Sequence, residues 1–403
     1  MIQFEAAQRA VIESCAPLGT ESSSLADAVG RVLGKTLRAE TDLVPFARSA
    51  MDGFALRSVD TASETALPIR SRIFAEQSTP IVHEACTATE IATGAPIPWG
   101  ADAVVPVEHV VRENGAIRLH STVSAGANVF PPGEDAHAGD TLLSAGHRLS
   151  AADAGLLAAS GNAQVEVFVR PRVAIVTSGD EVVEPGVRPA HGQIRNSNAA
   201  LLSATLQRWG CRIVSCVHAG DDEGLLRSRL SEALANCDLL VTTGGASVGE
   251  RDFMKGLLRQ LGATFVFDSV ALRPAKPSAF ARYENVRVAV LPGNPSSAFV
   301  ALHELVRLAA LTLSGESEVA LPRLEARLEG RLHGKAQRTY AAYASLHIAS
   351  DGFVATPLDN QCSALTRTAS EAAGFIIAPP GRHEYEPGDR VLVDVVDWSK
   401  LNH

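Results

Sequence analysis

The stretch Asp238-Leu-Leu-Val-Thr-Thr-Gly-Gly-Ala-Ser-Val-Gly-Glu-Arg-Asp252 decides the fold of the central part of this chain. Its first half, Leu239 to Thr243, is a short apolar, β-branched run that is typical of a buried strand. Gly244 and Gly245 then let the backbone turn sharply and let a ligand come close. A helical pattern opens at Asp252. A strand, a glycine loop and a helix start together form a cradle whose free N–H groups bind phosphate.

Two carboxylates, Glu250 and Asp252, lie beside this cradle. A carboxylate next to a phosphate usually holds a hydrated Mg²⁺ between them. A tight strand-to-helix turn with Asp252 as the helix cap explains the same residues without any ligand. The neighbouring loops therefore have to decide between a phosphate site and a structural turn.

The composition describes an ordinary globular protein. Of the 403 residues 46% are hydrophobic and 20% are charged, and the length predicts about two to four domains. The formal net charge of -9 argues against a nucleic-acid partner. We expect no membrane partner, because no apolar run reaches the roughly 20 residues that span a bilayer and no signal pattern opens the chain. The six cysteines lack metal-like spacing, which predicts reduced thiols in a cytoplasmic protein.

The patterns along the chain predict an α/β plus β multidomain fold. A strand-rich module interrupts a helical N-terminal part, an alternating strand–helix region follows, and short strands with turns close the chain. Within the inserted module, the spacing of Asp52-Gly53 on its own predicts a hairpin turn. The expected parts are residues 1–42 with 139–169 (helical), 43–138 (inserted β module), 170–316 (open three-layer α/β domain) and 317–403 (small β-barrel or sandwich).

The alternation in residues 170–316 predicts an open, mostly parallel sheet between two layers of helices. Asn196 is expected to cap one of these helices, and a hairpin precedes the last one. Ligands bind beyond the carboxyl ends of the strands in such sheets. The loops expected to converge there are Ser178-Gly-Asp-Glu181, Asp221, Gly244-Gly-Ala-Ser-Val-Gly249 and Pro292-Gly-Asn-Pro295.

Six segments in this order resemble the molybdopterin molybdenumtransferase family, which includes the gephyrin C-terminal domain. The resemblance covers nearly the whole chain, and the ordered set is far more specific than any single motif. The segments are Ser49-Ala-Met-Asp-Gly-Phe-Ala55, Thr93-Gly-Ala-Pro-Ile-Pro98, Gly133-Glu-Asp135, Thr177-Ser-Gly-Asp-Glu181, Gly244-Gly-Ala-Ser-Val-Gly249 and Leu291-Pro-Gly-Asn-Pro295.

The resemblance implies a homodimer, with residues 1–42 and 139–169 as the dimerisation part and 170–316 as the molybdopterin-binding domain. The active cleft is then shared between this domain and the inserted module of the partner. The implied reaction inserts molybdate into adenylylated molybdopterin in the presence of Mg²⁺ and releases AMP and molybdenum cofactor.

The residue types fit this chemistry. Cleavage of a phosphoanhydride needs metal-held geometry, so Glu181, Asp221 and Asp252 are natural ligands for Mg²⁺ or water, and the resemblance adds Asp52 and Asp135 as catalytic residues. The expected substrate-binding residues are Thr93, Ser178, Asn196, Gly244, Gly245, Ser247, Gly249, Pro292, Asn294 and Pro295.

Molybdate is a tetrahedral dianion and needs cations and hydroxyls. The segment Leu272-Arg-Pro-Ala-Lys-Pro277 resembles the basic KPGKP segment of the family, which implies that Arg273 and Lys276 bind molybdate together with Ser297. Ser363, in Asn360-Gln-Cys-Ser363, is a weaker candidate for the same site. A solvated basic turn also explains residues 272–277.

The sequence departs from the family pattern in this region. Arg273 stands in place of a lysine and Ala275 in place of a glycine. Tyr340 stands where the family often has an arginine, so one cation of the molybdate site is absent. Arg338 is a neighbouring substitute, but adjacent strand residues face opposite sides of a sheet, which argues against it.

Two alternatives remain beside the transferase. The related molybdopterin adenylyltransferase has a fold that resembles residues 171–315 alone, and the additional parts of this chain argue against it. A non-catalytic molybdopterin-binding scaffold is kept open by the altered segment around Tyr340.

Overall fold

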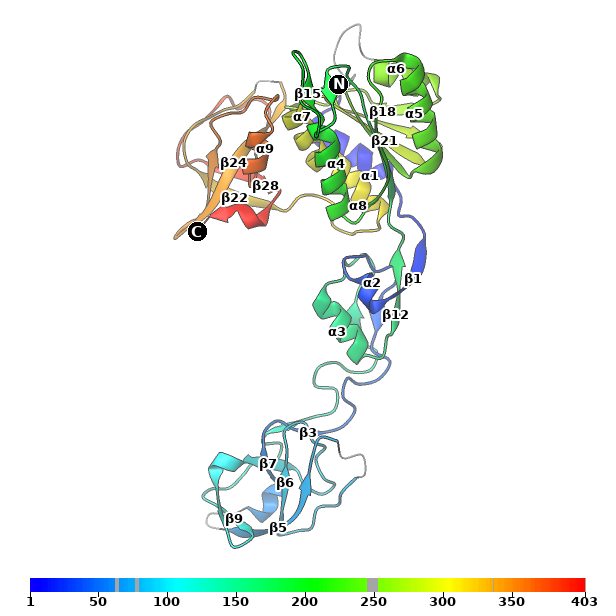
Figure 1. Ribbon diagram of the computed structural model, residues 1–403. Coiled ribbons are helices and arrows are strands. Elements are labelled where there is room, and N and C mark those ends of the chain that lie inside the picture. The colour runs from blue at the N-terminus through cyan, green and yellow to red at the C-terminus, as the bar shows by residue number, and fades with distance from the viewer. Residues whose placement is uncertain (62–64, 77–79, 245–252, 336, 403) are drawn as a thin grey trace.

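The central sheet has six strands in the order β16-β13-β17-β21-β20-β18 (Figure 1). In the computed structural model, which describes residues 1–61, 65–76, 80–244, 253–335 and 337–402, the first four of these strands run parallel. The predicted hairpin of β20 and β21 adds the antiparallel edge, and the predicted mostly parallel sheet is thereby confirmed. The strands span Arg172–Thr177 (β13), Arg212–His218 (β16), Leu239–Thr243 (β17), Thr264–Phe267 (β18), Ala279–Tyr283 (β20) and Val286–Leu291 (β21).

Helices cover both faces of this sheet. Val173 and Ile175 pack in one core with residues of α1, α4, α7 and α8, whereas Ala174 and Val176 pack in another core with α5 and α6. Because successive strand residues point to opposite faces, the two cores lie on opposite sides of the sheet. The helices span Phe4–Glu13 (α1), Ser197–Arg208 (α4), Glu223–Asn236 (α5), Phe253–Gln260 (α6), Pro295–Ala301 (α7) and Arg307–Leu313 (α8).

Helices α7 and α8 form one continuous run through a π-helical turn at Leu302–Val306. The run Pro295–Leu313 has 19 residues and a mean hydropathy of 1.3, so by length and composition alone it is long and apolar enough to cross a membrane. However, 89% of its most apolar window is buried inside the protein. Such burial is typical of the core helix of a globular domain.

The N-terminal part is less helical than the sequence predicted. Helix α1 joins the core of the α/β region, and Thr20–Ser24 forms strand β1, which pairs with β12 (Gln164–Phe168). The helical prediction was wrong for this serine-rich run because serine competes for backbone hydrogen bonds and favours caps and turns over helix interiors. The remaining elements here are α2 (Leu25–Ala28), β2 (Leu37–Arg38), β11 (Thr141–Leu143) and α3 (Ala151–Ala159), which begins at a capping box of Ser150 and Asp153.

The inserted module is a six-stranded sheet in the order β7-β4-β6-β5-β9-β8. The hairpin predicted at Asp52-Gly53 is wrong, because β3 (Arg48–Ser49) before it pairs with β10 (Val129–Phe130), while β4 after it pairs with β6 and β7. The strands of the sheet span Gly53–Leu56 (β4), Ala66–Ile73 (β5), Ala88–Ile91 (β6), Ala103–Pro106 (β7), Val110–Glu113 (β8) and Ala116–Leu119 (β9).

The predicted C-terminal β-barrel is also confirmed. Five strands close into a ring, β24-β25-β22-β28-β26, because β26 pairs back with β24. A two-residue strand of the central part, β19 (Leu272–Arg273), pairs with β24 from outside the ring. The ring strands span Arg323–Leu328 (β22), Thr339–Ala349 (β24), Gly352–Pro357 (β25), Gly374–Ala378 (β26) and Arg390–Val395 (β28), and helix α9 spans Arg367–Glu371.

The molecule is elongated (Figure 1). The α/β region and the barrel lie side by side at one end and share a hydrophobic core, in which Tyr343 and Phe375 of the barrel pack against Phe299 of α7. The part with α2 and α3 lies in the middle, and the inserted module lies at the far end. The inserted module is therefore far from the α/β region within one chain.

Candidate active site

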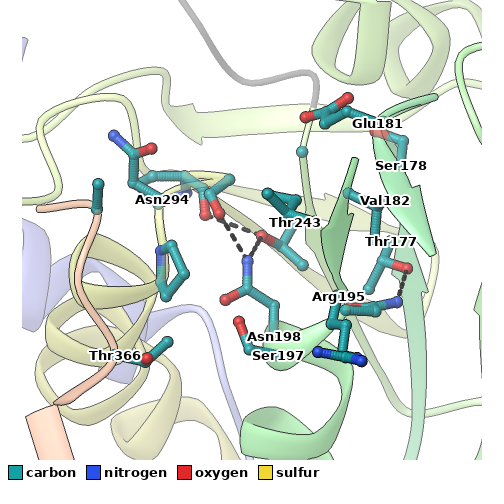
Figure 2. Close-up of a pocket in the computed structure, with 18 of the residues that line it drawn as sticks. Thr177, Ser178, Glu181, Val182, Arg195, Ser197, Asn198, Thr243, Asn294 and Thr366 are labelled. Carbon is teal, nitrogen blue, oxygen red and sulfur yellow. Dashed lines mark hydrogen bonds between the residues drawn. The ribbon is translucent and has the colours of Figure 1, made fainter. Parts of the chain in front are cut away.

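A cavity of about 710 Å³ opens at the carboxyl ends of the parallel strands. The loops that follow β13, β16, β17 and β21 all contribute to its wall, as the sequence led us to expect. Figure 2 shows their side chains around a common space. Of the predicted substrate-binding residues, the cavity brings together Ser178, Asn196, Gly244, Pro292, Asn294 and Pro295, together with Glu181 and Asp221.

The close approach of β13 and β17 requires a glycine at position 244. The Ser178 N–H donates to the Thr243 carbonyl at 3.0 Å, and Gly244 follows with a φ of +96°. A Cβ on Gly244 would lie 2.4 Å from the Ser178 carbonyl oxygen and 2.6 Å from its hydroxyl. Only a glycine fits there, so the strand end stays open to a ligand. The predicted residues Gly245, Ser247, Gly249, Glu250 and Asp252 lie outside the described residues.

A network of buried polar side chains shapes the cavity floor (Figure 2). The Asn198 amide nitrogen donates to the Thr243 hydroxyl at 3.0 Å and to the Gly293 carbonyl at 2.8 Å. The Thr243 hydroxyl donates in turn to the Pro292 carbonyl at 2.8 Å. The sequence patterns did not point to Asn198, although Asn196-Ser-Asn198 at a helix start contains a second asparagine that the cap does not use.

Two buried atoms of this network have no hydrogen-bond partner within the described part of the chain: the Ser178 hydroxyl and the Asn198 amide oxygen. An unpartnered buried polar group is costly, so these atoms are suited to bind a ligand. Asn196 has a different role, because it caps α4 through Ala199 N–H at 3.1 Å and donates to the Thr177 hydroxyl at 2.9 Å. It lines the cavity mainly as a structural residue.

Glu181 and Asp221 supply the carboxylates of the cavity. The adjacent acids are used elsewhere: Asp180 accepts from the Asp221 N–H at 2.9 Å, and Asp222 caps α5 by accepting from Leu225 N–H at 2.7 Å. Within the described residues no group of three or more His, Cys, Asp and Glu side chains is placed to hold a metal ion. A metal ion here would therefore take some of its ligands from the protein and the others from the substrate, as Mg²⁺ commonly does.

A second cavity of about 400 Å³ adjoins the first and shares Pro277, Pro292 and Asn294 with it. Its wall comes from both the α/β region and the barrel. All four residues predicted for molybdate, Arg273, Lys276, Ser297 and Ser363, line it, and so does Arg338. Ser297 is 5% exposed, and Arg273 and Lys276 are exposed to solvent. The start of α7 adds further positive potential to this cavity through the helix dipole.

The sequence matches three families that follow one another along the chain. They are the MoeA N-terminal region (domains I and II) over residues 2–161, the probable molybdopterin-binding domain over 174–312 and the MoeA C-terminal region (domain IV) over 325–396. The molybdopterin molybdenumtransferase of Bacillus subtilis (strain 168) is 33% identical over 401 residues, which cover 95% of this chain and 93% of that protein. The chain belongs to the molybdopterin molybdenumtransferase family.

Other family members agree with this assignment. The molybdopterin molybdenumtransferase of Synechococcus elongatus is 37% identical over 317 residues, covering 76% of this chain and 78% of that protein. The crystal structure of a molybdopterin biosynthesis MoeA protein from Pyrococcus horikoshii superposes with a TM-score of 0.82 at 28% identity, covering 98% of this chain and 99% of that chain. The similarity therefore extends over all parts of the fold and not over the α/β region alone.

The molybdopterin molybdenumtransferase fold places Arg338 and Tyr340 in the same cavity. Arg338 lies just before β24, which begins at Thr339, so the alternation of strand residues that argued against it does not apply there. The Tyr340 ring lies near two cations, 5.7 Å from the Arg273 guanidinium and 5.8 Å from the Lys335 ammonium. Burial raises the pKa of the Tyr340 phenol above its ordinary value, so the side chain stays neutral beside them.

Asp52, Thr93 and Asp135 do not reach either cavity of their own chain. Asp52 follows β3, Thr93 follows β6 and Asp135 follows β10, and strands β3 and β6 lie far from the α/β region (Figure 1). Asp52 accepts hydrogen bonds from the Thr93 backbone N–H at 2.7 Å and from the Thr93 hydroxyl at 2.9 Å. The backbone bond is the largest cause that lowers the pKa of Asp52. Asp52 and Thr93 thus form one hydrogen-bonded pair within the inserted module.

Proposed function

We propose that this chain inserts molybdenum from molybdate into adenylylated molybdopterin and releases AMP and molybdenum cofactor. The observation that carries the proposal is the pair of adjoining cavities with the common residues Pro277, Pro292 and Asn294. The larger cavity, about 710 Å³, has the size of a typical site for a nucleotide-bearing small molecule. The smaller one presents cations and hydroxyls to an oxyanion next to it.

In the larger cavity, the chain's own residues bind and orient the pterin nucleotide. The Ser178 hydroxyl has both a donor and an acceptor free for a phosphate oxygen or an N–H group. The Asn198 amide oxygen has only acceptor capacity, so it selects an N–H or O–H donor of the ligand. Gly244 lets the phosphate approach the backbone. These three contacts would fix the anhydride relative to the second cavity.

Glu181 and Asp221 fit a hydrated Mg²⁺ and are the residues that we propose to hold it. Their carboxylates face the cavity and, within the described residues, accept no hydrogen bond from another side chain. One or two carboxylates together with substrate phosphates are the usual ligand set of Mg²⁺ in proteins. When bound, the ion neutralises charge that develops on the phosphate oxygens. Asp252 is proposed as a third ligand from outside the described residues.

In the second cavity, Arg273, Lys276 and Arg338 supply the positive charge for molybdate. Charge-assisted hydrogen bonds from guanidinium and ammonium groups are the strongest contacts that a side chain offers to an oxyanion. The Ser297 and Ser363 hydroxyls complete the wall as donors. Arg338 thereby supplies a cation that the tyrosine at position 340 does not.

We also propose that the active protein is a homodimer in which Asp52, Thr93 and Asp135 of one subunit complete the cavity of the other. Their distance from both cavities in one chain supports this proposal, since a two-fold interface is the simplest way to bring them there. Co-expression of Asp52→Ala and Glu181→Ala chains tests it. Each mixed dimer then has one intact site, so random pairing restores about a quarter of wild-type activity. Activity of a stable monomer in light scattering contradicts the proposal.

The reaction is tested with purified chain, adenylylated molybdopterin and Mg²⁺, with and without molybdate. We expect AMP release and cofactor formation that both depend on molybdate. An adenylyltransferase would instead consume ATP in the presence of molybdopterin, and a non-catalytic scaffold would bind the adenylylated pterin without AMP release.

The absence of disulfides, with all six cysteines free, supports a cytoplasmic location.

A further inference from the structure

The loop Asn360–Ser363 of the barrel forms one wall of the second cavity, and the side chain of Gln361 fastens it. The Gln361 amide oxygen accepts from Tyr343 N–H at 2.9 Å. The amide nitrogen donates to the carbonyls of Tyr343 at 2.9 Å and Leu358 at 2.7 Å. The side chain therefore pairs with both backbone groups of Tyr343 in β24, as a residue of a neighbouring strand does. It continues the ladder at the point where β25 ends at Pro357.

The other end of this loop is attached to the start of α7. The Ser363 carbonyl accepts from Ser296 N–H at 3.1 Å, and its hydroxyl accepts from the Asn294 amide at 3.3 Å. The Tyr343 hydroxyl donates to the Ser296 carbonyl at 2.6 Å. Hydrogen bonds thus join Tyr343 to Gln361, Ser363 to Ser296 and Ser296 to Tyr343, and the backbone from Gln361 to Ser363 closes the ring.

The amide of Gln361 has no donor left for an anion, although Gln361 lines the second cavity. A glutamine amide has two donor hydrogens, and both are used on the backbone carbonyls of residues 343 and 358. Its oxygen is used by the N–H of residue 343. The Ser363 hydroxyl at the other end of the loop retains a free donor, since the Asn294 amide uses only its acceptor.

We propose that Gln361 is the positioning residue of the oxyanion cavity. It holds the loop on β24 and thereby keeps the Ser363 hydroxyl at the start of α7, in the cavity that Arg273 and Arg338 also line. This inference rests on the proposed function, since molybdate is taken as the ligand of the cavity. The anion then binds to a wall whose donors are fixed in advance, which saves the free energy of ordering them.

A cysteine thiol in this wall can report whether the second cavity is occupied. Cys362, between Gln361 and Ser363, lines the second cavity and is exposed. Cys86 and Cys216 are also exposed, and neither lines one of the two cavities. A molybdate ion in the cavity should therefore slow the alkylation of Cys362 by iodoacetamide and leave the other two thiols unchanged. Mass spectrometry of each cysteine peptide measures the three rates in one sample.

The experiment compares wild type with Gln361→Met, which has a similar shape but makes none of the three hydrogen bonds. We expect Gln361→Met to need at least about ten-fold more molybdate for half-protection of Cys362. The KM for molybdate should rise by the same factor, and the KM for adenylylated molybdopterin should stay unchanged. Lys400→Met is the matched control, because Lys400 also ties a barrel segment through two backbone carbonyls, at 2.6 and 3.2 Å, but does not line the second cavity.

Three results overturn the inference. Equal half-protection in Gln361→Met and wild type shows that Gln361 has only a structural role, and so does an equal effect of Lys400→Met. No protection of Cys362 in wild type removes molybdate from this cavity, while molybdate-dependent AMP release still tests the reaction separately. If Gln361→Met does not yield folded protein, Gln361→Asn keeps the same groups on a shorter side chain. Melting temperatures of all variants separate a loss of fold from a loss of binding.

Discussion

Removal of the Arg338 side chain is the sharpest test of the anion site. Arg338 lines the second cavity with Arg273, Lys276 and Tyr340, the residue that stands where the family often has an arginine. A charge-assisted contact contributes roughly 1.5–3 kcal/mol when it is well formed. Since 1.4 kcal/mol corresponds to about a factor of ten, Arg338→Ala should weaken molybdate binding about 10- to 150-fold.

The reverse change, Tyr340→Arg, has opposing effects. It adds a cation to the cavity, but it removes the ring that lies 5.7 Å from Arg273 and 5.8 Å from Lys335. Each such contact is worth about 0.5–1 kcal/mol at an exposed site, and the new guanidinium repels both cations. We therefore expect a gain in molybdate affinity of less than about ten-fold in the wild-type background. In the Arg338→Ala background, the same change should restore most of the lost affinity.

The assay is the molybdate dependence of AMP release at saturating adenylylated molybdopterin, supported by direct calorimetric titration of molybdate. Arg390→Ala is the control, because Arg390 lies on the barrel at 3.6 Å from Glu325 and does not line the cavity. If Arg338→Ala and Tyr340→Arg both leave the molybdate dependence unchanged, the anion binds elsewhere. The roles proposed for Arg273 and Lys276 are then wrong as well.

Three further outcomes are expected. Burial, and then a neighbouring carboxylate, hold the pKa of Glu304 well above its ordinary value. The contribution of Glu304 to the free energy of unfolding is therefore complete below about pH 4.3 and is lost as pH rises toward the raised pKa. In urea unfolding between pH 5 and 8, the free energy of unfolding of the wild type should fall by up to about 1.4 kcal/mol per pH unit because of Glu304, and Glu304→Gln should remove this dependence. Ala275→Gly should leave the free energy of unfolding nearly unchanged, because relief of the strained φ of +89°, about 1–2 kcal/mol, offsets the loss of a buried methyl group and the entropy cost of glycine. Ala279→Gly is the control, and there the same two losses should lower the free energy of unfolding by about 1.5 kcal/mol. Glu181→Gln and Asp221→Asn should each raise the Mg²⁺ concentration needed for half-maximal AMP release, and an unchanged requirement would remove both residues from the metal site.

Local sequence patterns were sufficient to predict the central sheet and the edge of that sheet at which the first cavity opens. The apolar run at 239–243 and the alternation across 170–316 identified the strands, and the loops between elements showed where a ligand could bind. Asn198 escaped prediction because its role depends on partners 45 and 95 positions away in the chain, Thr243 and Gly293. A helix-start asparagine has the same local pattern whether it caps the helix or crosses to another strand.

Helix α1 shows a different limit. Its apolar spacing predicted a helix correctly, but spacing does not identify the surface that the helix covers. Phe4, Ala7 and Val11 pack into the core of the α/β region rather than with α2 and α3. A one-sided apolar pattern fixes the buried face of a helix, and only the tertiary contacts decide its partner.

The second cavity belongs to no single part of the chain, and this explains why the sequence could name its residues but not their arrangement. Strand β19 has only two residues, too few for any periodic pattern, yet its pairing with β24 places Arg273 beside Tyr340. On the opposite side, Asn294 and Ser363 meet across 69 positions of sequence. A substitution that loosens the barrel from the α/β region should therefore weaken oxyanion binding and barrel stability together. The floor of the first cavity is built from α4, β17 and the loop after β21, all within the α/β region, so binding of the nucleotide part should persist.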